Sequence, residues 1–187
     1  SRTNWILTNI DKSPKISDAK KTQYKGEAHF LRGLYYFNLV RLFGDVPWID
    51  KQQTASDDLQ VSRTSKDIVY QHIIDDFSDA ASMLPAVYEN TTDIGRATKG
   101  AAFGLLAKVY LTLKRYNETL VAIDSVTNLG VYSLNRKYEW NFSDLRENGP
   151  ESLFEVQYEK DVTAYSEFDI LGQGGWHHEY MAPLASI

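Results

Sequence analysis

The sequence predicts a mainly all-α fold of paired helices, with a small irregular or β element near residues 150–160. Apolar residues recur at steps of three and four in residues 24–43 and 64–84, which is typical of helices with a buried face. A segment rich in Gly and Ala opens a third periodic stretch over residues 98–129. The chain has 187 residues, of which 43% are hydrophobic, so we expect one helical domain with a sizeable core over residues 1–187.

The first strong helix is predicted over residues 24–43. Its apolar residues form two faces, with Ala28, Leu31, Tyr35, Leu39 and Leu42 on one and Phe30, Leu34 and Phe37 on the other. Two apolar faces predict a central helix that is nearly surrounded by protein, with aromatic rings that build a core rather than a ligand site. Gly44 and Pro47 are predicted to end this helix.

The second helix is predicted over residues 64–84, with Thr64 and Asp67 in an arrangement like a capping box. Its expected buried stripe consists of Val69, Ile73, Phe77, Ala80 and Leu84. Asp75, Asp76 and Asp79 are expected on the solvated side, with His72 paired to Asp76 at the surface.

Helices predicted over residues 98–113 and 118–129 form a second antiparallel pair. Small residues in the first helix and a short turn make this a tetratricopeptide-like helix pair, a unit that stacks to build binding surfaces. The apolar positions expected in the later helix are Leu120, Ile123, Val126 and Leu129. After Gly130 the pattern changes, and alternation in "SLFEVQYE" (residues 152–159) predicts a short strand.

Composition excludes several functions. The chain has no cysteine, which excludes disulfides and thiol catalysis, and no basic cluster of the kind that binds nucleic acid. We expect no metal at His177, His178 and Glu179, since adjacent side chains rarely aim at one ion and the H-E-x-x-H pattern is absent. No cofactor motif and no catalytic constellation is present, so we predict no enzyme activity and no cofactor.

Four segments, in order, resemble the SusD/RagB family of outer-membrane nutrient-binding lipoproteins. They are "EAHFLRGLYYFNLVRLFGDVPWI" (27–49), "RATKGAAFGLLAKVYLTLKRY" (96–116), "GVYSL" (130–134) and "ESLFEVQY" (151–158). The resemblance covers nearly the whole chain. It implies a scaffold of tetratricopeptide-like helices.

The resemblance also implies a function. Members of the family bind glycans, or in some cases peptides, without cleaving them, and they cover a SusC-like TonB-dependent transporter on the extracellular face of the outer membrane. Because full members are longer and begin at a lipidated cysteine, we expect this chain to be an internal fragment. It would then meet the membrane only through an anchor that this sequence lacks.

Glycan binding requires exposed aromatic rings beside polar side chains. The predicted ligand-binding residues are Trp176 with His177, in a Gly-flanked loop, and Trp5, which has Asn4 and Asn9 nearby. Trp48 and Trp140 are interpreted as packing residues. Two alternatives stay open: a tetratricopeptide-type adaptor that binds a protein or peptide, and a glycan-processing enzyme with two carboxylates in a cleft.

Overall fold

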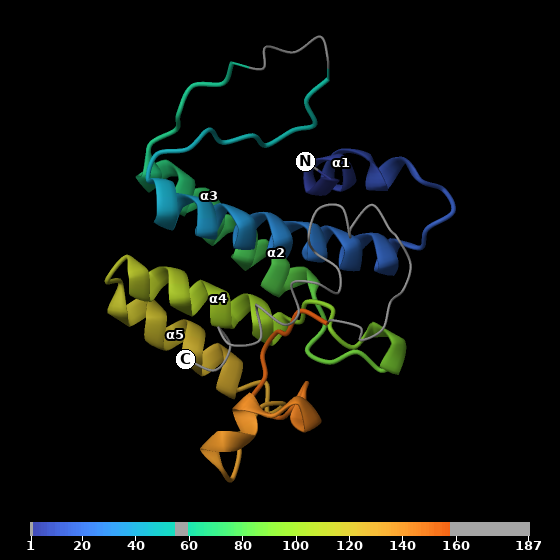
Figure 1. Ribbon diagram of the computed structural model, residues 1–187. Coiled ribbons are helices and arrows are strands. Elements are labelled where there is room, and N and C mark those ends of the chain that lie inside the picture. The colour runs from blue at the N-terminus through green and yellow to red at the C-terminus, as the bar shows by residue number, and fades with distance from the viewer. Residues whose placement is uncertain (1, 55–59, 158–187) are drawn as a thin grey trace. The chain divides into compact units, whose positions relative to one another are not determined.

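The computed structural model describes residues 2–54 and 60–157, and the chain divides into two units, residues 1–132 and 133–187. The first unit holds α1 (Arg2–Asn9), η1 (Ile10–Lys12), α2 (Asp18–Phe43), α3 (Lys66–Met83), η2 (Thr91–Asp93), α4 (Lys99–Thr112) and α5 (Tyr116–Thr127) (Figure 1). The second holds η3 (Tyr138–Phe142) and η4 (Asp144–Arg146). The described residues contain no strand, only an isolated antiparallel bridge between Val46 and Thr64, which confirms the mainly all-α prediction.

In the first unit, α2 and α3 lie side by side, as do α4 and α5, and α3 packs on α4 to join the two pairs (Figure 1). The short helix α1 packs on α2. This stacking of helix pairs is the arrangement that the tetratricopeptide-like interpretation predicts. None of the helices described in either unit combines the length and the apolar character needed to cross a membrane.

Helix α2 begins six residues before the prediction because Ser17 caps it. The Ser17 hydroxyl accepts a hydrogen bond from the Lys20 amide, at 3.4 Å. At the other end Gly44 has φ +67°, a conformation that favours glycine, and its amide donates to the Val40 carbonyl at 3.0 Å. The predicted end of this helix is therefore confirmed.

Helix α2 leaves one face largely exposed, and the expectation that protein nearly surrounds it is wrong. Phe30 and Phe37 are buried against α3, with the Phe30 and Phe77 ring centroids 5.9 Å apart. Gly33 lets the two helices approach, since a Cβ there would lie 3.1 Å from the Phe77 ring. On the other predicted face only Ala28 is buried, and the exposed side chains are Leu31, Tyr35, Leu39 and Leu42.

Helix α3 begins at Lys66 rather than near Thr64, and the predicted capping arrangement is wrong. Thr64 lies in the bridge to Val46, and its amide donates to the Val46 carbonyl at 3.0 Å. Asp45, from the turn after α2, accepts from the Lys66 amide at 2.8 Å and takes the place of a local cap. The predicted buried stripe is confirmed: Val69, Ile73, Phe77, Ala80 and Leu84.

The α4–α5 pair is confirmed, and two of the apolar positions expected in α5 are exposed. Thr98 caps α4 by accepting from the Ala101 amide at 3.1 Å. On α5 the side chains turned toward protein are Thr119 and Ala122, whereas Leu120 and Ile123 are exposed. Val126 and Leu129, the other two expected apolar positions, are half-buried.

The second unit is held by hydrogen bonds between loops. The Ser133 amide donates to the Pro150 carbonyl at 3.0 Å, and the amides of Asn148 and Gln157 bond each other at 2.9 and 3.1 Å. Residues 152–157 of the predicted strand form no β-ladder with other described residues, and residues 158–159 lie outside the described part. A strand needs a neighbour for its backbone groups, and the described part of this unit offers none.

Candidate functional site

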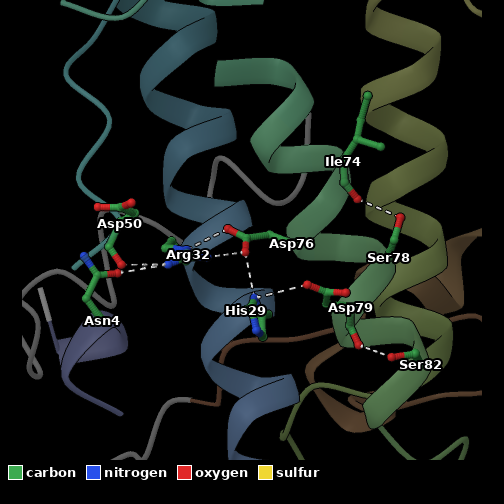
Figure 2. Close-up of polar contacts among 9 residues, drawn as sticks. All are labelled: Asn4, His29, Arg32, Asp50, Ile74, Asp76, Ser78, Asp79 and Ser82. Carbon is green, nitrogen blue, oxygen red and sulfur yellow. Dashed lines mark hydrogen bonds and ion pairs between the residues drawn. The ribbon is translucent and has the colours of Figure 1, made fainter. Parts of the chain in front are cut away.

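Asp76 is the centre of a buried polar cluster where α2, α3 and the start of α1 meet (Figure 2). Asp76 is 2% exposed, although the sequence predicts a solvated position for it. Arg32 binds it with two parallel hydrogen bonds, from Nε to Oδ2 at 2.8 Å and from Nη2 to Oδ1 at 2.7 Å. His29 Nδ1 also lies 2.7 Å from Oδ1. Burial of this carboxylate is compensated by a bidentate guanidinium and an imidazole.

Asn4 extends the cluster to the chain segment that follows α2. Its Nδ2 donates to the Ile49 carbonyl at 2.7 Å and to the Lys51 carbonyl at 3.1 Å. Arg32 Nη1 donates to Asn4 Oδ1 at 3.3 Å and to the Asp50 carbonyl at 3.4 Å (Figure 2). One arginine therefore ties α1, α3 and residues 49–51 to α2.

Trp48 packs over the same cluster, as the sequence predicts. Its ring stacks on His72, with centroids 4.4 Å apart and an interplanar angle of 11°, and lies 4.3 Å from the Tyr36 ring. The Arg32 guanidinium carbon lies 5.1 Å from the Trp48 ring centroid. The predicted surface pair of His72 with Asp76 is thus wrong: His72 stacks on Trp48, and Asp76 is paired to α2.

The Tyr36 hydroxyl forms hydrogen bonds with the backbone on both sides of Trp48. The hydroxyl oxygen accepts from the Ile49 amide at 2.9 Å and its proton is donated to the Pro47 carbonyl at 3.3 Å. Burial raises the pKa of Tyr36, and the bond from Ile49 opposes the rise. The residue therefore acts as a neutral hydrogen-bonding group.

The chemistry of the cluster is structural. Both Asp76 oxygens are occupied by donors, so the carboxylate is not free to act as a base, a nucleophile or a metal ligand. In the described ranges 2–54 and 60–157, no three His, Asp or Glu side chains are grouped so that they could hold a metal ion. The cluster fixes the shape of the surface beside it.

Sequence reasoning missed this cluster. The available signal was His29 and Arg32, two polar residues that flank the apolar pair Phe30 and Leu31 in the aromatic-rich part of the helix. Their partner is 44 residues from Arg32 and 47 from His29, so no local pattern identifies it.

A pocket of about 310 Å³ opens next to the cluster, between α1 and α2. Arg32 and Asn4 form its polar wall, and Tyr35 and Leu39 contribute exposed apolar surface. The full lining is Arg2, Thr3, Asn4, Arg32, Tyr35, Tyr36, Leu39 and Ile49. A cavity with one polar wall and one aromatic wall matches the chemistry of an amphipathic ligand.

Of the predicted ligand-binding residues, Trp5 is described and Trp176 and His177 lie outside the described residues. Trp5 is 53% exposed on α1. The neighbouring Asn4 faces inward and is committed to residues 49 and 51, and Asn9 Nδ2 donates to the Trp5 carbonyl at 2.9 Å. The exposed surface of α1 therefore presents the Trp5 ring, whereas the Asn4 amide is buried and does not lie beside that ring on the surface.

Comparison with known proteins identifies similar chains. The family model for SusD-like proteins, described as starch-binding associating with outer membrane, matches residues 1–111. A SusD-like protein of Formosa agariphila is 26% identical over 96% of this chain. The crystal structure of a SusD-like protein from Bacteroides fragilis is 34% identical over 86% of the chain, with a TM-score of 0.78. A laminarin-binding SusD-like protein is 28% identical over 84%, also with a TM-score of 0.78.

The chain spans about a third of the length of these proteins. It covers 36% of the Formosa agariphila protein, 32% of the Bacteroides fragilis chain and 35% of the laminarin-binding chain.

Proposed function

The chain belongs to the SusD-like family, and on that premise we propose that it is part of a non-enzymatic glycan-binding protein of the outer membrane. The protein captures an oligosaccharide or polysaccharide at the extracellular face and passes it to a partner TonB-dependent transporter of the SusC type. The observation that carries this proposal is the family match over residues 1–111, which covers α1 to α3 and nearly all of α4. The laminarin-binding structure of similar fold supports the glycan class of ligand.

Binding takes place on exposed aromatic rings. Apolar faces of sugars stack on Trp or Tyr, and nearby polar groups bond the hydroxyls. Trp5 offers such a ring on α1. Trp176 and His177 are proposed as a second contact on the basis of their sequence alone.

Capture without cleavage is proposed because the matching family and the laminarin-binding relative are described by binding. Glycoside hydrolysis uses one carboxyl group as an acid and another as a nucleophile or base. Asp76, the buried carboxylate of this unit, is bound by Arg32 and His29. Its role is to hold α2 and α3 together.

The exposed face of α2 is suited to contact a protein. Leu31, Tyr35, Leu39 and Leu42 form an apolar stripe there that the first unit leaves exposed. We propose this stripe as part of the protein-facing side of the scaffold, in addition to the glycan-binding rings.

Affinity electrophoresis tests the proposal. The 187-residue chain is run through native gels that contain soluble starch or laminarin, and retardation by at least one polysaccharide is expected. Trp5→Ala and Trp176→Ala should each weaken retardation with little effect on thermal unfolding, whereas Trp5→Phe should retain most of it. Unchanged retardation of Trp5→Ala would remove Trp5 from the site. Release of reducing sugar during incubation would contradict the non-enzymatic role.

A groove between α4 and α5 favours a second candidate, an adaptor for a protein or peptide. The groove has a volume of about 270 Å³ and is mostly apolar. Its lining is Phe103, Leu106, Tyr110, Asn117, Glu118, Val121, Ala122 and Ser125. The adaptor is favoured if no polysaccharide binds and if peptides selected from a random library lose their binding in Val121→Asp.

A further inference from the structure

We propose that the second unit carries a glycan subsite on η3, in which the Tyr138 ring stacks on a sugar and Asn141 and Glu151 bond its hydroxyls. The inference rests on the proposed function and adds to it a location and a ligand chemistry. The subsite lies in η3 (Tyr138–Phe142), where the sequence analysis interprets Trp140 as a packing residue.

The aromatic part of the subsite is Tyr138 with Phe142. Tyr138 is 79% exposed, the most exposed aromatic side chain in the described part of the chain. Its ring centroid lies 5.2 Å from that of Phe142, at 63°, in an edge-to-face contact. This contact fixes the ring without covering it. The Tyr138 hydroxyl makes no hydrogen bond to another described residue, so it is available to a ligand.

The turn places an amide beside this ring. Side chains three residues apart eclipse each other in a 3₁₀-helix, so Tyr138 and Asn141 lie on the same face of η3. Asn141 is itself exposed. A ring and a planar amide on one face present the two contacts that a sugar requires, an apolar surface and hydrogen-bonding groups at its edge.

Glu151 and Asn135 hold that amide in a fixed orientation. Asn141 Nδ2 donates to Glu151 Oε2 at 3.0 Å, and Asn135 Nδ2 donates to Asn141 Oδ1. The Asn135 backbone amide donates to the same Glu151 oxygen at 3.0 Å. The bond from the Asn135 backbone, followed by that from Asn141, lowers the pKa of Glu151, which keeps the carboxylate ionised as an acceptor. Its Oε1 has no partner among the described residues.

Trp140 has a different role in the same turn. The Arg146 guanidinium carbon lies 3.8 Å from its ring centroid and covers one face. Trp140 is half-buried, as its interpretation as a packing residue requires. It supports the turn from behind, and the exposed ring of Tyr138 is the one left for a ligand.

Calorimetric titration of the 187-residue chain with soluble starch and with laminarin tests the inference. Tyr138→Ala and Asn141→Ala should each weaken binding of the polysaccharide that the unaltered chain binds by about tenfold. Tyr138→Phe keeps the ring and should stay within about threefold of the unaltered chain. Tyr116→Ala, which removes a tyrosine that is 60% exposed on α5, is the matched control and should not change affinity.

The outcomes separate this inference from the proposed function. If the chain binds and both Tyr138→Ala and Asn141→Ala bind equally well, the subsite is overturned while glycan binding stands. If the unaltered chain binds neither polysaccharide, both proposals are overturned. Thermal unfolding of each variant, followed by circular dichroism, shows whether lost binding reflects lost folding. If Tyr138→Ala proves to be unfolded, Tyr138→Phe tests the stacking role instead. A folded Tyr138→Phe variant whose affinity falls by tenfold or more would contradict that role.

Discussion

Asp76 is a buried charge whose removal leaves Arg32 without its carboxylate. Arg32 would keep only its two longer bonds, to Asn4 and the Asp50 carbonyl. Loss of one partner of a buried ion pair costs about 3–5 kcal/mol. We therefore expect Asp76→Ala to lower the free energy of unfolding by that amount in urea denaturation.

Asp75→Ala is the matched control for this prediction. Asp75 is exposed and accepts only a bond from Gln71, at 2.8 Å, so its removal should change stability by less than about 0.5 kcal/mol. Equal effects of the two substitutions would contradict the role assigned to Asp76.

The stabilisation that Tyr88 contributes to the fold is expected to be lost at alkaline pH. Its hydroxyl donates to the Ala97 carbonyl at 2.8 Å and lies 3.4 Å from Glu27 Oε1. Burial, and next the charge of Glu27, raise the pKa of Tyr88 above its ordinary value. Because the folded pKa exceeds the unfolded one, this stabilisation is present below the ordinary tyrosine pKa and is lost as pH rises toward the folded pKa.

Tyrosinate absorbance during alkaline titration measures this effect. We expect a late-ionising group of tyrosines that includes Tyr88, Tyr36 and Tyr70, for each of which burial raises the pKa. Tyr88→Phe should remove one tyrosine from the late group and none from the early group. A loss from the early group instead would show that Tyr88 titrates like an exposed tyrosine.

Single residues were predictable where the signal was local. Trp48 follows a helix that ends at a glycine and lies beside Ile49, and its packing role is confirmed. Asp76 was assigned to the solvated side because Asp75 and Asp79 are nearby in sequence. Arg32, the residue that determines the position of Asp76, lies 44 positions away in the sequence. Hydrophobic periodicity reports on neighbours within one helix and cannot identify such a distant partner.

At the scale of elements, the α2–α3 interface rests on aromatic rings. Phe37 is 1% exposed and packs edge-to-face on Tyr70, with centroids 6.4 Å apart. Phe37→Ala should cost about 3–5 kcal/mol, because it removes a buried ring and leaves a cavity. Urea denaturation gives the value.

Phe43 on the same helix provides the control, since it is 65% exposed. Phe43→Ala should cost less than about 1 kcal/mol. A cost below that value for Phe37→Ala as well would show that α2 does not contribute a core ring.

Gly100 sets the close approach between α4 and the segment after α5. A Cβ on Gly100 would lie 2.3 Å from the Tyr132 ring, and Tyr132 also bonds Thr98 Oγ1 at 2.9 Å. Gly100→Ala should therefore destabilise the fold by about 1–3 kcal/mol, despite the better helix propensity of alanine. Thermal unfolding tests this against Lys108→Ala, an exposed position of α4 that should be nearly neutral. Stabilisation by Gly100→Ala would contradict the close packing.

The existence of the helices was predictable, and their boundaries and faces only in part. Periodicity located α2 to α5, and Gly44 ended α2 as expected. The start of α3 was missed because its cap, Asp45, comes from 21 residues away. One apolar face of α2 was misassigned because periodicity marks an apolar stripe without showing which neighbour covers it. Leu39 is apolar and exposed, whereas Gly33 lies close to the Phe77 ring.

At the scale of the whole molecule, the helices of the first unit form a scaffold held by buried polar and aromatic contacts. The buried Arg32–Asp76 pair and the packed Trp48 fix α1, α2, α3 and residues 49–51. Exposed rings such as Trp5 and Tyr138 remain available for stacking. The SusD-like family was predictable from the four family-like segments, whereas the location of Tyr138 beside Asn141 depends on a 3₁₀ turn that has no strong sequence signature.

We propose that this chain binds a glycan without cleaving it, and calorimetric titration with soluble starch and with laminarin is the first experiment to perform. We expect saturable heat with at least one polysaccharide, an affinity lowered about tenfold in Trp5→Ala, and no release of reducing ends. The absence of saturable heat with both polysaccharides, from a chain that circular dichroism shows to be folded, would contradict it.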